Sequence, residues 1–542
     1  MNLRSGAGWQ LAAMLIAALV LLPIIALIGF AMQGSIGLWP HLFRTVLANA
    51  LTQTVILLFG VGLIVSVVGT VTAWLIAGFD FPGRRILGWA LLMPLAVPTY
   101  IIAYAYLDIL HPVGPVQSVI RDMLGYDSPR DFRLPDIRSM SGCIILLGFV
   151  LYPYVYLPVR ALFATQAANL LEASHTLGAG PLRVFWRIVL PLARPAIAVG
   201  MALALMETLN DIGAAEFLGV RTLTVSVYST WINRTDLPGA AQIALVMLTI
   251  VVLLVLIERA ARRGQRYAGG AQRLLPLARV RLRGPAAWGA TAFCALPVLI
   301  GFAIPASYLI QQAWRRIALA GIPAKIWTEA AQTAAIALTA TLIALGLGLL
   351  VSAAPRLRPN GVTRGAARLA TLGYAVPGTI LAIGILPVTT FADRQIGAVL
   401  GWFMTDPPRL LLLGSGAALI YAYVTRFLAI ASGGVEAGLT RIPVSLDHAA
   451  RSLGRTPSGV FRQIHLPLSR ASLAAAGLLI FVDCVKELPA ALLLRPLNVE
   501  TLATHLYGEA ARGTYEDGSL AALLIVLIGM APAILLSRAI RN

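Results

Sequence analysis

The sequence predicts an all-α integral membrane protein with twelve transmembrane helices, organised as two parallel six-helix repeats. Of its 542 residues, 58% are hydrophobic and 12% are charged, which is too apolar for a soluble chain of this length. Apolar runs of about 20 residues, enough to cross a bilayer as a helix, recur twelve times. An internal repeat divides these runs into two sets of six.

Each expected span is an apolar run between charged or turn-forming segments. The first run is too long for a signal-peptide core and no small-residue cleavage site follows it, so we expect it to remain as a span. The twelve spans lie near Leu11–Met32, Thr52–Ala77, Ile86–Leu107, Gly142–Val159, Ala196–Leu218, Ala240–Ile257, Ala286–Ile310, Ala330–Ala354, Leu369–Leu386, Leu410–Val424, Ala471–Leu494 and Leu520–Leu536.

The net charge of +19 comes mainly from arginines in short loops, the pattern of cytoplasmic loops in multi-pass proteins. It therefore indicates membrane lipid rather than nucleic acid as a partner. Residues 259–283 hold eight arginines and no acid, so the linker 259–285, between the repeats 1–258 and 286–542, is expected in the cytoplasm. Both termini then lie in the cytoplasm as well. Arg315, Arg316 and Lys325 are exceptions, because this topology places them outside.

The repeat is clearest in two polar loops, 165–194 and 436–470. Between Glu172–Arg194 and His448–Arg470, 11 of 23 positions are identical. A glycine in each copy permits a break, and a proline suited to a first helical turn follows. Each loop therefore predicts a short cytoplasmic helix, which Pro191 or Pro467 ends before the membrane helix begins. Its apolar stripe, Val184, Phe185 and Ile188 or Val460, Phe461 and Ile464, is expected to dock on another protein.

Shorter matches extend the repeat beyond the loops, at one constant offset. Gln53-Thr54 matches Gln332-Thr333, and Thr222-Leu223 matches Thr501-Leu502. Two copies with an even number of spans share one orientation, so the chain is expected to be a built-in dimer of six-helix units.

The two loops resemble the signature of the permease subunits of bacterial ATP-binding-cassette importers, which is Glu-Ala-Ala, a later glycine and Ile-x-Leu-Pro. The first copy reads Glu172-Ala173-Ser174 and Ile188-Val189-Leu190-Pro191, and the second reads His448-Ala449-Ala450 and Ile464-His465-Leu466-Pro467. Ser174 and His448 depart from the signature. The resemblance implies coupling helices seated on two ATPase subunits through Glu172, Ala173, Gly178, Phe185 and Pro191 in one half and His448, Ala449, Gly454, Phe461 and Pro467 in the other.

The same resemblance implies a periplasmic or lipid-anchored solute-binding protein and a place in the bacterial inner membrane. Over nearly its whole length the chain is similar to the fused permeases of ferric-iron importers, chiefly within Met206–Thr222 and Lys486–Ala503. Fused thiamine, phosphonate and other permeases share much of this similarity, so other small solutes remain alternatives. A twelve-helix secondary transporter and a non-transporting receptor are the alternatives from other classes, and the doubled loop argues against both.

Four acids in the fifth and eleventh spans are candidates for the translocation path. Glu207 and Asp211 are four positions apart on one helix face, and Asp483 and Glu487 are their counterparts in the second repeat. An acid inside a membrane helix costs about 2.5 to 3.5 kcal/mol, and oxygen ligands suit a hard trivalent cation. The alternative is structural: Lys486 would neutralise one acid and the others would bond to neighbouring helices.

Pro98 and Pro377, at matching sites in the third and ninth spans, are further candidates for the path. Each proline removes a helical hydrogen bond and would free the carbonyl of Pro94 or Gly373. Helices interrupted at corresponding places often line a translocation path, although kinking for packing explains the prolines equally well.

No catalytic or nucleotide-binding motif is present in the sequence. Neither lysine, Lys325 nor Lys486, belongs to a Gly-Lys-Ser/Thr phosphate-binding loop. We therefore expect no enzyme activity and no cofactor in this chain, with ATP used by a separate subunit. The histidines form no metal-ligand pair, so the sequence assigns no metal site, and Cys143, Cys294 and Cys484 are expected to be buried hydrophobes.

Overall fold

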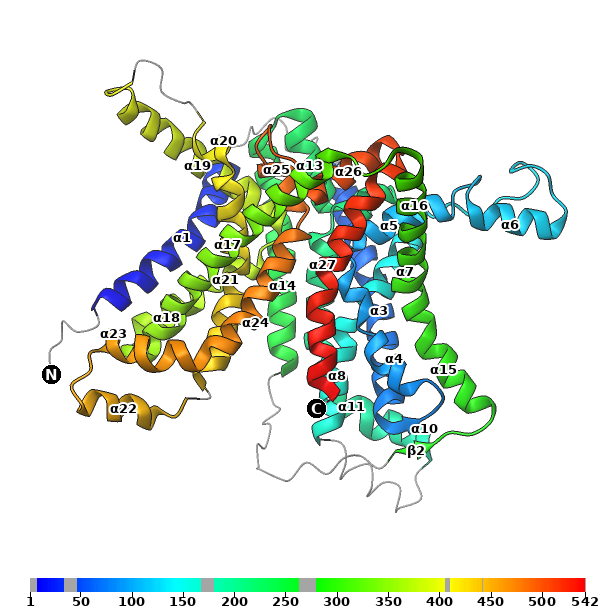
Figure 1. Cartoon of the computed structure of the whole chain (residues 1–542), viewed down its shortest axis with the longest axis horizontal. Coiled ribbons are helices and arrows are strands. Elements are labelled where there is room, and N and C mark those ends of the chain that lie inside the picture. The colour runs from blue at the N-terminus through cyan, green and yellow to red at the C-terminus, as the bar shows by residue number, and fades with distance from the viewer. Residues whose placement is uncertain are drawn as a thin grey trace. The chain divides into compact units, whose positions relative to one another are not determined.

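The computed structural model describes residues 7–33, 46–166, 180–262, 279–404, 410–440 and 442–541, and the regular structure there is almost entirely helical (Figure 1). Two short strands, β1 (Phe79–Asp80) and β2 (Val280–Arg281), pair in parallel. Within the described residues, ten helices are long and apolar enough to cross a membrane, and two bent helix pairs raise the number to as many as twelve. The predicted all-α membrane fold is confirmed.

The helices gather into two compact units, each assembled from three stretches of the chain. We name each unit by its longest stretch. The 323–505 unit also contains residues 1–42 and 227–248, and the 43–226 unit also contains residues 249–322 and 506–542. Helices α13 (Leu223–Arg234), α14 (Leu237–Arg262) and α26 (Leu502–Arg512) are divided between the units.

Long apolar helices form the body of the 323–505 unit, with α17 packed on α21 and α24. Short elements connect them. The unit contains α1 (Ala7–Met32), α17 (Ala324–Leu357), α18 (Gly361–Ala370), a 3₁₀ turn (Leu372–Ala375), α19 (Gly378–Leu400), α20 (Leu412–Ser415), α21 (Ala417–Thr440), α22 (Val444–Ser452), α23 (Pro457–Val460), a π-helical turn (Phe461–His465), α24 (Leu466–Val485) and α25 (Pro489–Leu494).

The 43–226 unit repeats this plan, with α3 packed on α7, α8 and α11. It contains α3 (Ala48–Gly78), α4 (Arg84–Ala90), a 3₁₀ turn (Met93–Ala96), α5 (Thr99–Ile109), α6 (Pro115–Leu124), α7 (Met140–Leu151), α8 (Pro153–Gln166), α10 (Pro181–Val184), π-helical turns (Phe185–Val189 and Leu299–Ala303), α11 (Leu190–Asn210), α12 (Gly213–Phe217), α15 (Pro285–Val298), α16 (Ile304–Ala320) and α27 (Tyr515–Arg541), together with the two strands.

The compact units do not follow the two sequence repeats, because each contains the first helix of the other repeat. In the 323–505 unit, α1 packs on α17, α18 and α19, and its Ala13, Ile16 and Val20 share a core with Val351 and Leu428. The close fit of α1 on α19 requires a glycine, since a Cβ at Gly384 would lie 2.2 Å from a carbonyl oxygen of α1. The repeat boundaries at 258 and 286 thus remain a property of the sequence, and the packing units cross them.

The same exchange places α16, from the second repeat, in the 43–226 unit. The Tyr308 hydroxyl donates to the Asp108 carboxylate of α5, and Gln312 Nε2 donates to the same carboxylate at 3.1 Å. Arg316 pairs with Asp517 of α27 at 2.6 Å. Polar contacts from two successive parts of α16 therefore fasten it to α5 and α27.

Both prolines that the sequence singles out lie at sharp bends. Pro98 separates α4 and its 3₁₀ turn from α5 at 94°, and Pro377 separates α18 and its 3₁₀ turn from α19 at 113°. The third and ninth spans are therefore broken rather than continuous helices. The carbonyls of Pro94 and Gly373 are not free as expected, because the amides of Val97 and Val376 each donate to them at 3.2 Å.

Candidate coupling helix and translocation helices

The second polar loop forms a separate surface helix, α22, which carries His448 and Ala449. Both residues are exposed, and so are the apolar side chains of Val444, Leu446 and Leu453 on or directly after α22. Gly454 follows with a φ of +79°, a left-handed conformation that strains any residue with a Cβ. The break expected at this glycine is therefore present. In the first loop, Glu172, Ala173 and Gly178 lie outside the described residues.

A buried polar cluster attaches α22 to the membrane helices of its unit. Asp447, on the inner face of α22, accepts from Arg356 Nε at 2.7 Å and from Arg356 Nη2 at 3.2 Å. His465 Nε2 lies 2.8 Å from the same carboxylate. Arg356 also donates to the carbonyls of Leu439 and Ile442, which lie at the end of α21 and just before α22. One carboxylate thus connects α22 to the end of α17 and to the π-helical turn before α24.

The electrostatics of this cluster favour a charged Asp447. Burial by itself raises the pKa of the carboxyl, but the hydrogen bonds and positive charge of Arg356 and His465 outweigh it and hold the pKa of Asp447 below its ordinary value. The first repeat has Leu171, Ala77 and Val189 at the positions that correspond to Asp447, Arg356 and His465. This attachment is therefore specific to the second repeat.

The apolar stripe expected to dock on a partner is partly buried in its own unit. Val460 and Val184 are buried, and the Phe461 ring lies edge-on against Trp9 of α1 with 5.1 Å between ring centroids. Phe185 likewise contacts Trp74 at 6.3 Å. The stripe does not lie on a separate short helix, because the proline-initiated helix runs on through the π-helical turn into α24 or α11 instead of ending. Docking of the stripe on a partner stays a prediction.

Pro191 and Pro467 accordingly do not end a separate helix. Each lies in the first turn of α11 or α24, where a proline costs no hydrogen bond that the helix would otherwise make. The π-helical turn just before each proline widens the helix and lets it pass without a break. Within the described part of the second loop, the exposed face of α22 offers a surface to a partner.

The eleventh span breaks at Glu487, which lies between α24 and α25. Glu487 Oε1 accepts from Arg426 Nη1 at 2.7 Å, and its Oε2 accepts from the amide of Ala490 at 3.0 Å, which caps α25. Both members of the ion pair are buried. Gly378 provides the space, since a Cβ there would lie 2.4 Å from Glu487 Oε1 and 2.7 Å from Arg426 Nη1. Glu487 is thus an ion-paired helix cap beside the bend at Pro377.

Asp211 occupies the corresponding break in the fifth span, between α11 and α12. Its Oδ1 accepts from the amide of Ala214 at 2.7 Å, so it caps α12 as Glu487 caps α25. Its buried Oδ2 has no hydrogen-bond partner in the described part of the chain. Glu207, half-buried, lies on the last turn of α11, so the two acids do not share one continuous helix.

Lys486 pairs with Asp483, three positions earlier in the chain. The two charged atoms are 2.8 Å apart, and both side chains are partly exposed, at 29% and 25%. The structure thus brings Glu487 and Asp211 to equivalent helix breaks beside Pro377 and Pro98, and leaves Asp483 and Glu207 on the preceding helical turns. Whether these residues line the path remains a prediction.

Two of the repeated sequence pairs contact one another in both units. In the 43–226 unit, Gln53 Oε1 accepts from the amide of Arg221 at 2.7 Å and Thr54 Oγ1 from the amide of Leu223 at 3.0 Å. In the 323–505 unit the corresponding acceptors, Gln332 and Thr333, bond to the amides of Glu500 at 3.1 Å and Leu502 at 2.9 Å. The Gln-Thr pair therefore ties the loop after the fifth or eleventh span to the start of the second or eighth.

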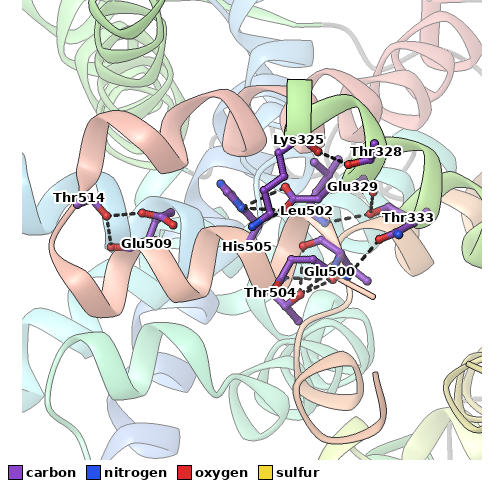
Figure 2. A network of polar contacts seen from close by, with 12 residues as sticks. Lys325, Thr328, Glu329, Thr333, Glu500, Leu502, Thr504, His505, Glu509 and Thr514 are labelled. Carbon is purple, nitrogen blue, oxygen red and sulfur yellow. Dashed lines mark hydrogen bonds and ion pairs between the residues drawn. The ribbon is translucent and has the colours of Figure 1, made fainter. Parts of the chain in front are cut away.

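A buried acid that the sequence analysis missed lies beside the contact of Thr333 with Leu502 (Figure 2). Glu329, 2% exposed on the first turns of α17, is 3.2 Å from Lys325 Nζ and 3.1 Å from His505 Nδ1. The first repeat has Ala50 and Ser226 at the corresponding positions. Glu329 and His505 thus replace small residues on the two sides of a contact that both repeats share. This difference between the repeats is the signal that could have revealed the pair.

No group of three or more His, Cys, Asp or Glu side chains in the described ranges is arranged to hold a metal ion. The three cysteines are free and buried, as expected.

The long apolar helices and the bent spans define a multi-pass membrane protein. A family model described as the binding-protein-dependent transport system inner membrane component matches residues 69–267. The Fe(3+)-transport system permease protein FbpB 2 of Haemophilus influenzae is 25% identical over 507 residues, which cover 92% of this chain and 91% of that protein.

Shorter relatives match part of the chain. The putative 2-aminoethylphosphonate transport system permease protein PhnU of Salmonella typhimurium is 30% identical and covers 49% of this chain and 96% of its own length. The molybdenum transport system permease protein ModB of Escherichia coli is 27% identical over 37% of this chain and 87% of its own. The chain therefore belongs to the family of inner-membrane permeases of binding-protein-dependent ATP-binding-cassette importers. Permeases of this family are membrane subunits that work with an ATPase and a solute-binding protein.

Proposed function

We propose that this chain is the permease of a ferric-iron importer. In this proposal it spans the bacterial inner membrane with both termini in the cytoplasm, receives iron from a solute-binding protein on the outer face and is driven by two ATPase subunits. The observation that carries the substrate is the similarity to the Fe(3+) permease, which extends over 92% of this chain and therefore over both repeats. The phosphonate and molybdenum relatives above each match less than half of it.

The coupling step of this proposal uses α22. Its exposed residues His448, Ala449 and Leu453 would sit on one ATPase subunit, and the loop with Glu172, Ala173 and Gly178 would sit on the other. Closure of the ATPase dimer would then move α22, and the Asp447 carboxylate would pass that motion to α17 through Arg356 and to α24 through His465. Phe461 and Pro467 belong to the helix that receives the motion.

The proposed path lies along the helices that break. In each unit a bend after a 3₁₀ turn, at Pro98 or Pro377, lies beside an acid that caps a short helix, Asp211 or Glu487. Broken helices leave backbone polar groups and carboxylates inside the membrane, where they suit the passage of an ion rather than contact with lipid.

The second candidate is a phosphonate importer, favoured by the 30% identity to the 2-aminoethylphosphonate permease, which is higher than the identity to the Fe(3+) permease. The charge of the substrate separates the two candidates. A cation would pass more easily beside Glu207 than an anion would, whereas the charge of Asp483 is balanced by Lys486.

The deciding experiment is reconstitution of the purified chain in liposomes with its ATPase and a ferric-iron-binding protein. ATP should drive transport of radioactive iron from the compartment that holds the binding protein into the compartment that holds the ATPase, and an ATPase variant that cannot hydrolyse ATP should abolish this transport. A parallel series with aminoethylphosphonate and its binding protein provides the comparison. ATP-dependent uptake of phosphonate without uptake of iron would refute the ferric-iron proposal and leave the importer class intact.

A further inference from the structure

The 323–505 unit contains a cavity of about 610 Å³, and the transport proposal gives no role to the space itself, although Arg356 is part of its lining. It opens among the end of α17, the helix α18, the end of α21 and the segment that leads into α22. The residues that matter for its chemistry are Ser352, Arg356, Arg364, Arg368, Ser432 and Glu436. The arginines place it at the membrane surface that the charge pattern assigns to the cytoplasm.

The lining has an excess of positive charge and a buried hydroxyl group that is not hydrogen-bonded in the described part of the chain. Arg364 and Arg368 are exposed, lie one helical turn apart on α18, and form no ion pair within the described residues. The charge of Arg356 is already balanced by Asp447, so Glu436 is the one acid of the lining that opposes them. Ser432 is 5% exposed, and its Oγ has no hydrogen-bond partner in the described part of the chain. Two guanidinium groups and a buried hydroxyl thus face a space of molecular size.

The first repeat shows what happens when such a space is filled. Close contacts establish the correspondence: a Cβ at Gly69 would meet the amide of Tyr156, and a Cβ at Gly348 would meet the amide of Ser432. Tyr156 therefore stands where Ser432 stands, and their separation along the chain equals that of Glu172 and His448 in the two loops.

In the 43–226 unit the side chains of the fourth span fill the site themselves. The buried Tyr156 hydroxyl donates to the Gly88 carbonyl at 2.9 Å, and Arg160 Nη1 donates to the same carbonyl and to the Tyr156 hydroxyl. In the second repeat, serine and Glu436 replace this tyrosine and arginine, and Arg368 replaces Trp89. The second repeat thus lacks the filling side chains and has gained a cation on the opposite wall.

We propose that this cavity binds a phosphate group, and that an anionic phospholipid supplies it. Guanidinium pairs match phosphate oxygens in charge and geometry, and a serine hydroxyl can donate to a third oxygen. The surface of α18 beside the arginines exposes the apolar side chains of Val362 and Leu369, and Leu372 follows them. A bound phospholipid would place its phosphate beside the arginines and its acyl chains along these apolar side chains. Basic headgroup sites at the cytoplasmic ends of membrane helices have the same arrangement.

Native mass spectrometry of the purified full chain tests the proposal with phosphatidylglycerol, cardiolipin and the neutral phosphatidylcholine. We expect retention of the anionic lipids, a loss of at least tenfold in affinity in Arg364→Gln/Arg368→Gln, and tighter binding in Glu436→Gln, which removes the opposing charge. Arg358→Gln is the matched control, because it removes a neighbouring arginine that does not line the cavity. Ser432→Tyr copies the first repeat and should exclude the lipid, and Ser432→Ala, which retains the volume, should weaken binding only a few-fold.

Competition distinguishes the source of the phosphate. Inorganic phosphate and glycerol phosphate, added at millimolar concentration, should not displace the lipid. Displacement would overturn the phospholipid as the occupant and assign the phosphate site to a soluble ligand. Equal retention of anionic and neutral lipids, or equal loss in Arg358→Gln and the double arginine variant, would overturn the proposal. Thermal unfolding of each variant verifies that it is folded, and the Glu436→Gln gain cannot arise from misfolding.

Discussion

Replacing Asp447 with alanine should free α22 while the rest of the 323–505 unit stays folded. The carboxylate accepts two hydrogen bonds from Arg356 and one from His465, and the side chains of Arg356, Asp447 and His465 are only 16%, 6% and 0% exposed. Removing one member of a buried ion pair costs about 3 to 5 kcal/mol. Arg356 keeps its hydrogen bonds to the carbonyls of Leu439 and Ile442 in this variant. We therefore expect the lower end of this range, about 3 kcal/mol.

Such a loss corresponds to a rise of about a hundredfold in the population with α22 detached. Hydrogen exchange of the α22 amides in the purified chain should accelerate by about that factor. In the assembled importer, ATP hydrolysis should continue while the amount of substrate moved per ATP falls. Arg358→Met, two positions from Arg356, removes an arginine that has no ion pair in the described ranges and should change neither quantity.

Two further results would complete the test of this attachment. Arg356→Met combined with Asp447→Leu should recover most of the lost protection, because an apolar pair leaves no buried charge. Since the folded-state pKa of Asp447 is depressed, its contribution is complete above the unfolded value, about 3.9, and is lost only as pH falls through the lower folded value. Wild-type α22 should therefore stay protected at pH 4. Unchanged exchange in Asp447→Ala would refute the attachment.

Four further outcomes follow from the same contacts. Gly378→Ala should destabilise the chain by about 1 to 3 kcal/mol in chemical unfolding, because its Cβ meets the Arg426–Glu487 pair, whereas Gly433→Ala, which meets nothing within 4 Å, should not. Gly454→Val should strain the turn after α22 by about 1 to 2 kcal/mol and lower transport without preventing membrane insertion; full transport would contradict the coupling role. The cost of Lys486→Met should be relieved by Asp483→Asn and not by Glu487→Gln, in a double-mutant cycle of stability. The purified chain should neither bind nor hydrolyse ATP until an ATPase subunit is added, and nucleotide binding by the chain alone would contradict this.

The features that the sequence predicts well are local or repeated. Apolar length is enough to place the spans, and Pro98 and Pro377 mark real bends because proline acts on the helix that contains it. The Gln-Thr and Thr-Leu matches predict more than repetition, since the two pairs contact each other in both units. Both pairs recur in the second repeat at the same offset along the chain, and this shared offset was the available signal that they contact each other.

The features that escaped prediction depend on partners distant in the chain. Arg426 was not associated with Glu487, because the two lie 61 positions apart and the first repeat has Val150 at the position of Arg426. The apolar stripe around Phe461 has the spacing of a docking surface, but Trp9, from the opposite end of the chain, packs against its Phe461 ring. Periodicity identifies a face to be buried and does not identify what buries it.

The exchange of first helices imposes an order on biosynthesis. Helix α1 is made first, yet Val351 and Leu428, which complete its core, belong to the second repeat and are made much later. At about 5 to 20 residues per second, the ribosome needs roughly 20 to 80 s to pass from Val20 to Leu428. During that interval the contact face of α1, built from Ala13, Ile16, Ala17 and Val20, faces lipid, which its apolar side chains tolerate. Neither repeat can complete its own packing when translated alone, so a chain divided within 259–285 should accumulate only when both fragments are produced in the same membrane.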